Sequence, residues 1–348
     1  MNKLFLTAIA GFFASTAMSS AGSLERTNRS VGILFEHGTH AELSYSLIAP
    51  NISGRDPALL NTGNMANRYS LVSGGYKTDL GEKFSLAVIF DQPFGIDNEY
   101  SQGFYSGISI NMRSNAVTLL LGYDVTDRIV VFGGGVAQNT NVTASTPYIA
   151  GYTATMAGDV GYGYVLGAAY QIPDRDLRVA LTYHSEIDTT HDTLEFVFLS
   201  STTNITTPQS VNLEFQAGLN AKTLLFGAAR WVDWSKFNIR PANYPLGTLF
   251  YPNHDSITYT LGIERKVSDR LALEVALNYE QGYLTNANAL LPNSGFWGIG
   301  FGATYNISDN TAISGRIEYQ ALDDVSGPFG SFTNNHAGSI GIKIAHTF

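Results

Sequence analysis

The sequence predicts an all-β fold, a 14-stranded antiparallel transmembrane β-barrel with a short N-terminal hatch segment. Three observations lead to this prediction. The first residues of the 348-residue chain resemble an export signal. Short polar turns then alternate with long loop-like segments, and the stretches between them alternate apolar with polar or small residues. Together these features predict a protein of the outer membrane of a Gram-negative bacterium.

The N-terminus has the three parts of a secretory signal peptide. Lys3 gives a positive start, residues 4–18 form an apolar run, and Ser19, Ser20 and Ala21 supply small residues for cleavage. The run is shorter than the roughly 20 residues that a membrane-spanning helix needs. We therefore expect residues 1–21 to be a signal peptide that is removed after Ala21.

The composition excludes several classes of protein. Charged residues make up 14% of the chain, whereas soluble domains carry roughly 25%. Beyond Gly22 no apolar stretch approaches the length of about 18 residues that indicates a membrane helix. The net charge of −9 argues against nucleic acid as a partner. The absence of cysteine fits an exported protein.

The spacing of turns predicts the number of strands. Six short polar turns lie at 78–82, 124–127, 173–176, 220–222, 268–270 and 308–310. Seven longer segments alternate with them, at about 51–66, 94–108, 143–157, 191–208, 237–254, 285–294 and 325–333. Thirteen connections imply fourteen strands, which we place in residues 41–348. Short turns at one end and long loops at the other are typical of a bacterial outer-membrane barrel.

The strands themselves show a period of two residues. In the stretch 271–279, Leu273, Val275 and Leu277 point to one side, while Glu274 and Asn278 point to the other. The final stretch alternates in the same way and ends at Phe348, an aromatic last residue that is typical of outer-membrane barrels. Apolar residues facing lipid and polar or small residues facing the lumen explain this pattern. The run Gly133–Gly135 lies inside such a strand, where it indicates close packing of the wall.

Several tracts resemble the FadL/TodX family of outer-membrane transporters for long-chain fatty acids and other hydrophobic compounds. They are 91–95 (DQPFG), 228–237 (AARWVDWSKF), Pro208-Gln209, Leu291-Pro292 and Phe296-Trp297. The resemblance implies a fourteen-stranded barrel, with 91–95 closing the third strand at the start of an extracellular loop. One feature departs from the family. Only residues 22–40 are left for the hatch, and the family's Asn-Pro-Ala tract is missing.

Candidate ligand-binding residues fall into two groups. We expect Arg178, Arg230 and Arg316 to face the lumen, where a guanidinium suits the carboxylate of a fatty acid. Internal pairing of such arginines with glutamates that share their face, such as Glu318, is the competing interpretation. The second group consists of apolar residues in the 143–157 and 191–208 loops, where we expect a capture site: Tyr148, Ile149, Phe196, Phe198 and Leu199.

The sequence carries no motif of an enzyme. It lacks Gly-x-Ser-x-Gly, His-Glu-x-x-His and a phosphate loop. His184 and His191 lie near three acidic residues, but polar residues at strand ends explain them without a metal. We therefore expect no catalytic residue, cofactor or metal, and a monomer in contact with outer-membrane lipid. The expected function is passive uptake of hydrophobic molecules, most of all long-chain fatty acids. An aqueous porin, a channel for aromatic hydrocarbons, a barrel enzyme and an adhesin remain alternatives.

Overall fold

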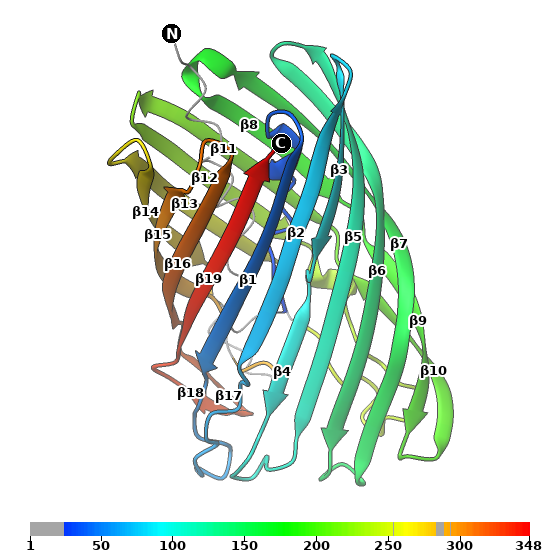
Figure 1. The fold of residues 1–348 in the computed structure, drawn as a ribbon. Coiled ribbons are helices and arrows are strands. Elements are labelled where there is room, and N and C mark those ends of the chain that lie inside the picture. The colour runs from blue at the N-terminus through cyan, green and yellow to red at the C-terminus, as the bar shows by residue number, and fades with distance from the viewer. Residues whose placement is uncertain (1–23, 253, 283–288, 293) are drawn as a thin grey trace.

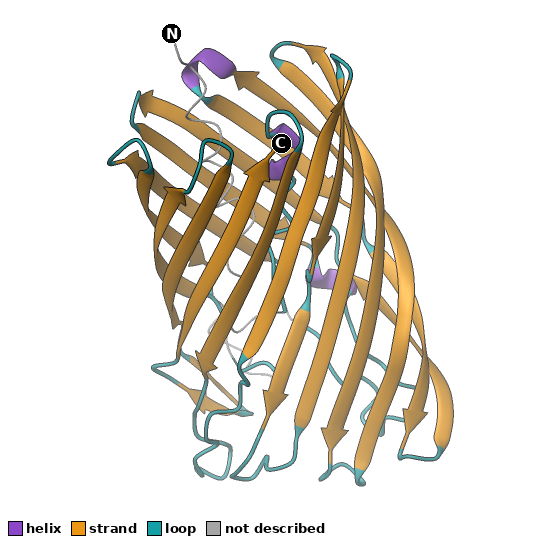
Figure 2. Ribbon diagram, viewed as in Figure 1, coloured by secondary structure: helices purple, strands orange, loops and turns teal. Residues whose placement is uncertain are grey.

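The computed structural model describes residues 24–252, 254–282, 289–292 and 294–348. The expected signal peptide, residues 1–21, lies outside the described residues. One sheet curves into a barrel, and a two-stranded sheet lies at one end (Figures 1 and 2). The barrel strands are β1 (His40–Asn51), β2 (Tyr69–Leu80), β3 (Phe84–Asp91), β4 (Gly95–Glu99), β5 (Ser109–Thr126), β6 (Ile129–Thr146), β7 (Tyr152–Ile172), β8 (Leu177–His184), β9 (Ile187–Glu195), β10 (Leu199–Thr207), β11 (Ser210–Asn220), β12 (Thr223–Val232), β13 (Ser256–Lys266), β14 (Leu271–Glu280), β15 (Phe296–Asn306), β16 (Thr311–Leu322) and β19 (His336–Thr347).

Helical structure in the described residues is limited to three 3₁₀ turns, η1 (Gly32–Phe35), η2 (Pro173–Arg175) and η3 (Trp234–Lys236). The strands β17 (Val325–Gly327) and β18 (Gly330–Phe332) form the small separate sheet. No helix in the described part of the chain is long and apolar enough to cross a membrane.

The barrel closes between the first and last strands. β1 pairs antiparallel with β19 from His40 opposite Thr347 to Asn51 opposite His336. Three positions in the wall are each formed by two successive segments of the sheet, β3 with β4, β8 with β9, and β10 with β11. The seventeen segments therefore fill fourteen positions, which confirms the predicted strand number. Because β1 and β19 pair with each other, neither end of the sheet is left as an edge in lipid, where unpaired backbone groups are costly.

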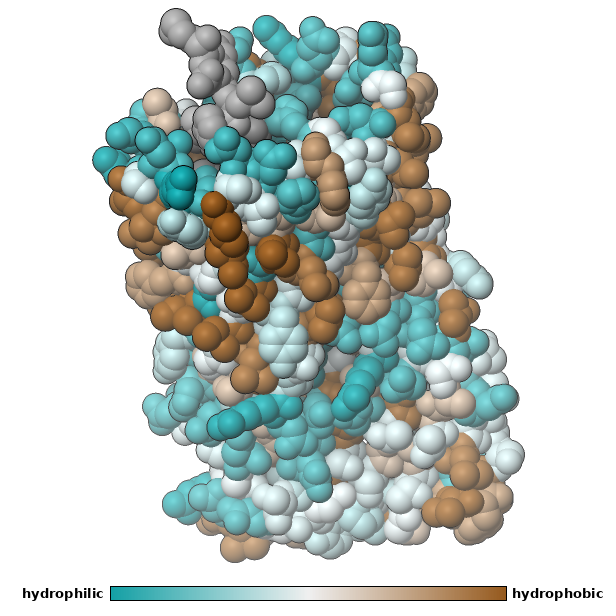
Figure 3. Space-filling model, in the orientation of Figure 1, coloured by the Kyte–Doolittle hydropathy of each residue, from teal (hydrophilic) through white to brown (hydrophobic). Residues whose placement is uncertain are grey.

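The two faces of the wall separate as the alternation predicts. On β14, Leu273, Val275 and Leu277 are exposed on the outside, while Glu274 and Asn278 are buried inside. In the half of the barrel nearer the C-terminus, hydrophobic side chains gather over β16, β19 and β1 (Figure 3). A row of aromatic residues crosses the outer face, because Tyr279 lies 6.4 Å from Tyr259 and 4.4 Å from Trp297, between ring centroids. Such rows mark the membrane interface of a barrel.

Two segments expected as long loops are strands instead. β6 and β7 continue to Thr146 and Tyr152, so their connection is only 147–151. The segment 191–208 contains parts of β9 and β10, which pair from Ile187 opposite Thr207 to Leu199 opposite Glu195. β7 has 21 residues, whereas about 9 to 11 suffice to cross a bilayer. This side of the barrel therefore extends beyond the membrane, which composition alone did not reveal.

Glycine shapes the wall at two places. Gly81, in the turn between β2 and β3, has a φ of +77°, a conformation that favours glycine. Gly134 lies against β5, because a Cβ there would be 1.8 Å from the Leu119 carbonyl oxygen. The Gly133–Gly135 run thus lies in a strand and, at Gly134, allows close packing of the wall, as predicted.

A charge on the lipid-facing surface tests the membrane assignment of the strands. We expect Val275→Arg to lower the free energy of unfolding in lipid vesicles by about 2–4 kcal/mol, because arginine is costly in the middle of the bilayer. Thr202→Arg, outward on β10 beyond the aromatic row, is the matched control and should change it little. Urea titrations followed by tryptophan fluorescence measure both. Equal effects of the two substitutions would contradict the assignment.

Candidate functional site

The wall is interrupted between β2 and β4. β3 pairs with β2 over residues 74–80, but after Asp91 the chain leaves the sheet, and β4 pairs with β5 alone among the named strands. Pro93 lies in the interruption and has no N–H to donate to a neighbouring strand. The tract 91–95 therefore interrupts the third strand. β3 does end at Asp91, as expected, but pairing with β5 resumes at Gly95, so the tract leads into β4 rather than directly into a long loop.

A cavity of about 350 Å³ lies at this interruption. Its apolar lining comes from Leu71 and Val72 on β2 and from Phe94, Ile96 and Met112 across the gap. The Gln92 side chain crosses the gap. Its Oε1 accepts from the Val72 backbone N–H at 2.9 Å, and its Nε2 donates to Asn115 Oδ1 at 2.9 Å. We call this cavity the wall opening.

The N-terminal segment, residues 24–39, closes the wall opening from inside. Its Arg26 N–H donates to the Pro93 carbonyl, and the Gly95 N–H donates to the Leu24 carbonyl, each at 2.8 Å. The Thr27 hydroxyl donates to Asp91 Oδ2 at 3.0 Å. Backbone groups that lack a partner strand at the gap are therefore satisfied by this segment, as burial in a membrane requires.

Further along, the same segment packs against an apolar part of the lumen. Ile33 and Leu34, in η1, are buried among side chains of β3, β5, β6, β7, β8 and β9. Phe35 meets Phe132 edge to face, with ring centroids 5.8 Å apart. Hydrophobic burial of this kind holds the segment inside the barrel.

Arg230 anchors the segment to the opposite wall. Its Nε donates to Glu25 Oε1 at 2.7 Å, and its Nη1 donates to Ser210 Oγ and Asn212 Oδ1 at 3.0 and 2.6 Å. Arg230 and Glu25 are 5% and 4% exposed, so this is a buried ion pair between β12 and the N-terminal segment. The predicted inward direction of Arg230 is confirmed, and an internal carboxylate already accompanies it.

The other two lumen arginines have different surroundings. The Arg178 guanidinium lies 4.5 Å from the centre of the Phe35 ring, a cation–π contact. Arg316 donates through Nη2 to Glu318 Oε2 at 2.6 Å. The Arg316–Glu318 contact is the internal pairing that the sequence left as an alternative. The described contacts do not bring the three arginines to one site.

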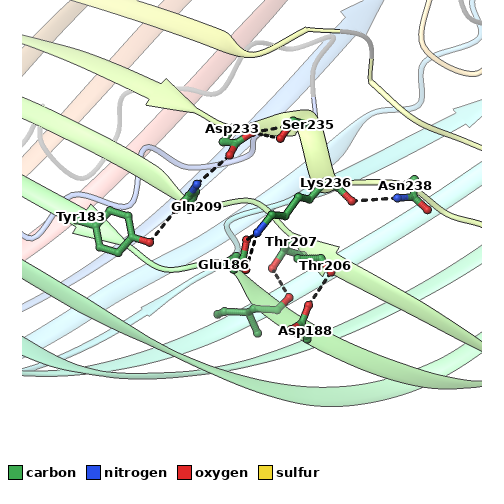
Figure 4. Close-up of polar contacts among 11 residues, drawn as sticks. Tyr183, Glu186, Asp188, Thr206, Thr207, Gln209, Asp233, Ser235, Lys236 and Asn238 are labelled. Carbon is green, nitrogen blue, oxygen red and sulfur yellow. Dashed lines mark hydrogen bonds and ion pairs between the residues drawn. The ribbon is translucent and has the colours of Figure 1, made fainter.

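A second interruption lies where β8 passes into β9 and β11 follows β10 (Figure 4). Glu186 does not share the inner face of Arg178 and His184. After Ser185 the strand changes face, and Glu186 pairs with the exposed Lys236 at 2.7 Å. Gln209 links the two sides, accepting from the Tyr183 hydroxyl and donating to Asp233 Oδ2, each at 2.8 Å.

The two histidines do not form a metal site. His191 donates through Nδ1 to the Ala157 carbonyl at 2.8 Å, and its Nε2 contacts the Thr189 hydroxyl. His184 is buried on the inner face of β8. Among the described residues no group of three or more His, Cys, Asp or Glu side chains could hold a metal ion.

At the extracellular end the expected capture residues lie in one apolar region. Tyr148 is 60% exposed and stacks on Phe104 with a centroid distance of 5.8 Å. Phe196 meets Tyr152 edge to face at 5.1 Å, so the two predicted loop segments touch. Phe198 is 76% exposed and Leu199 38%. Ile149 packs against the cluster beneath.

Two tyrosines beneath this surface fix neighbouring loops. The Tyr100 hydroxyl donates to the Ala289 carbonyl at 2.5 Å, and the Tyr105 hydroxyl donates to the Phe329 carbonyl at 3.1 Å. Burial raises the pKa of Tyr105 to about 12 and raises the pKa of Tyr100 further. Both phenols therefore stay protonated donors at neutral pH.

The sequence reasoning missed the residues around the wall opening. Glu25 and Arg26 precede any strand, so no periodicity marked them. Gln92 lies in a tract that was interpreted as the start of a loop. The available signal was Pro93 within an otherwise strand-like stretch, because proline in a sheet indicates an interruption.

The comparisons with known proteins agree with this architecture. The sequence profile of the family described as outer membrane protein transport protein (OMPP1/FadL/TodX) matches residues 38–329. Among solved structures, a Pseudomonas aeruginosa FadL homologue matches with a TM-score of 0.77 at 13% identity, covering 100% of this chain and 99% of that one. The P. putida toluene transporter TodX matches with 0.68 at 14%, covering 90% of each chain. The Ralstonia pickettii toluene transporter TbuX matches with 0.66 at 14%, also covering 90% of each. No curated protein matches the sequence.

The closed fourteen-position barrel with its lipid-facing apolar wall defines an integral outer-membrane protein. Because the family profile covers more than half of the chain, the protein belongs to the OMPP1/FadL/TodX family of outer-membrane transport proteins, as the sequence motifs indicated. It is thus an outer-membrane transporter of hydrophobic compounds.

The buried pair of Arg230 and Glu25 gives a test of the N-terminal anchor. We expect Arg230→Ala to destabilise the folded protein by about 3–5 kcal/mol, because the Glu25 carboxylate loses its guanidinium in a buried place. The double variant Glu25→Gln with Arg230→Met should recover most of that loss. Urea unfolding of both variants in the same vesicles measures this. An Arg230→Ala variant as stable as the original would show that the pair does not anchor the segment.

Proposed function

We propose that the protein takes up hydrophobic molecules, long-chain fatty acids above all, by passive diffusion from the cell exterior through the barrel wall. One observation carries this proposal. The wall has an opening of about 350 Å³ whose lining combines apolar side chains with polar and charged ones, beside the exposed Val72 and Phe90 on the lipid side. A molecule that leaves through such an opening reaches the hydrocarbon without crossing water, which suits a ligand of low solubility.

The extracellular surface supports capture as the first step. Tyr148, Phe198 and Leu199 are exposed, with Ile149 and Phe196 beneath them. Exposed apolar patches commonly mark binding surfaces. Burying a ligand there contributes about 25 cal/mol per Å² of apolar surface.

Inside the barrel, we propose that residues 22–40 act as a hatch, because the described part of this segment is packed against the lumen wall and fastened at the wall opening. A segment in that position obstructs a straight aqueous path, which speaks for the transporter over the porin. Arg230, Arg178 and Arg316 are the proposed partners of a ligand carboxylate. For Arg230 the ligand would replace Glu25, which has the same chemistry.

The choice of ligand is the finer part of the proposal. The three arginines of the lumen favour fatty acids as ligands, because a guanidinium group matches the two oxygens of a carboxylate. Two of the similar structures are toluene transporters, so aromatic hydrocarbons are the second candidate. We propose that the protein works as a monomer, since one chain closes the barrel and contains the opening. Its other partner is outer-membrane lipid.

Filling the wall opening tests the exit route. Ser70 borders the cavity and is exposed. We expect Ser70→Trp to reduce the initial rate of palmitate uptake into proteoliposomes several-fold, because the indole occupies the exit. Ser200→Trp, exposed on β10 away from the cavity, is the control. Heat-modified gel mobility verifies that both variants fold. Unchanged uptake by the Ser70 variant would contradict the exit route.

Making the capture surface polar tests the first step. We expect the double variant Tyr148→Ser with Phe198→Ser to raise the half-saturating ligand concentration of uptake and leave the maximal rate near its original value. Removed apolar contacts weaken capture but leave the exit intact. Leu246→Ser, also exposed at this end, controls for general loss of apolar surface. A drop in maximal rate alone would count against a capture role.

A further inference from the structure

The wall opening is lined by cations as well as by apolar side chains. Arg26 from the N-terminal segment, Arg68 just before β2, and Arg113 on β5 all border it. Asp97 is the single carboxylate among its lining residues. Three guanidinium groups and one carboxylate leave the opening positively charged.

Arg26 is held in position without a counter-ion. It is 8% exposed, its Nε donates to the Gly95 carbonyl at 2.9 Å, and its guanidinium carbon lies 3.3 Å from the centre of the Tyr69 ring. In the described part of the chain it forms no ion pair, and its two terminal nitrogens have no protein acceptor. A buried cation ordinarily requires a paired anion. The ring contact and the carbonyl fix its orientation at the cavity, and neither of them supplies a negative charge.

The other two cations are also only weakly compensated. Arg113 is 69% exposed along its side chain and its Nη2 lies 3.9 Å from Asp97 Oδ2, the limit of an ion pair. Asp97 also accepts from the Asn67 amide at 3.0 Å. Arg68 is exposed and has no ion pair among the described residues. Exposed pairs of this kind contribute little binding energy, so an incoming anion can compete for Arg113.

We propose that the wall opening is an anion-binding site for the headgroup of a single-chain amphiphile, with Arg26 as the central contact and Arg68 and Arg113 at the rim. The ligand chemistry is a carboxylate or another anionic oxygen headgroup joined to an alkyl chain. The headgroup meets the guanidinium groups, and the chain lies along the apolar lining of the same cavity. This inference rests on the proposed function and deepens it, because it selects amphiphilic acids over neutral hydrocarbons at the exit.

The guanidinium is well suited to this role. It offers paired donors that match both oxygens of a carboxylate, and it stays charged at every physiological pH. A neutral aromatic ligand makes no such contact. The site would therefore affect the passage of acids through the wall opening and leave the passage of neutral ligands unchanged. Binding should weaken as salt is raised, since the rim cations are exposed to solvent.

The experiment measures equilibrium binding of palmitate and of hexadecanol to the full barrel in phosphatidylcholine nanodiscs. We expect Arg26→Gln to weaken palmitate binding about tenfold, as for loss of one charge-assisted contact, and to leave hexadecanol binding within about twofold. The double variant Arg68→Gln with Arg113→Gln should give a smaller, salt-sensitive loss. These two side chains are exposed, so this variant tests the site even if Arg26→Gln fails to fold. Arg175→Gln with Arg270→Gln, exposed in turns at the opposite end, is the control of equal charge.

The outcomes separate this proposal from the proposed function. If palmitate binds no better than hexadecanol and the variants change neither, the anion site is wrong, while hydrophobic uptake stands as long as hexadecanol binds and crosses. If neither ligand binds or crosses, the proposed function itself fails. A third arm adds phosphatidylglycerol to the nanodiscs. One outcome is that this lipid abolishes palmitate binding to the original protein and not to the variants. In that case the three arginines bind the headgroup of a membrane lipid, and the assignment to a transported acid is overturned.

Discussion

The need to pair every backbone N–H and carbonyl group inside a membrane governs this structure. Fourteen wall positions satisfy it by closing on one another, with β1 against β19. The third position departs from this rule at Gln92–Phe94, where the chain leaves the sheet. There the missing partners are supplied by the Gln92 side chain and by the backbone of Leu24 and Arg26. The N-terminal segment behind the interruption thus completes its backbone pairing.

This dependence joins two features that sequence reasoning treated separately. The short N-terminal segment looked too small to fill a barrel of fourteen strands. Yet Ile33 and Leu34 pack on one side of the lumen, and Glu25 reaches Arg230 on the other. Together with the hydrogen bonds of Leu24, Arg26 and Thr27 at the wall opening, these contacts hold the segment in place. A ligand whose carboxylate competes with Glu25 for Arg230 would therefore act on the N-terminal segment, which also completes the wall.

The arginines divide between structure and recognition according to their neighbours. Arg316 has Glu318 at hydrogen-bond distance and Arg230 has Glu25, so both charges are compensated within the protein. Arg26 has an aromatic ring and a carbonyl instead. An aromatic ring attracts a cation but does not neutralise it. The strength of each arginine as a ligand contact therefore follows from what the fold places beside it.

The sequence by itself determined the barrel, its strand number and the face of most side chains. A period of two residues and the turn spacing are local properties of the sequence. Because a sheet in lipid must close on itself, these two patterns together specify one barrel. It also determined that Arg230 and Arg316 point inward. Only the tertiary structure decided which groups meet. Pairing of Glu25 with Arg230 spans about two hundred residues, and the change of face at Ser185 sent Glu186 outward. The wall opening lies where pairing of β2 with β3 stops, at Gly74 opposite Phe90, and where Pro93 has no N–H to donate. Which strand runs beside this tract is set by the register of the sheet rather than by the local sequence.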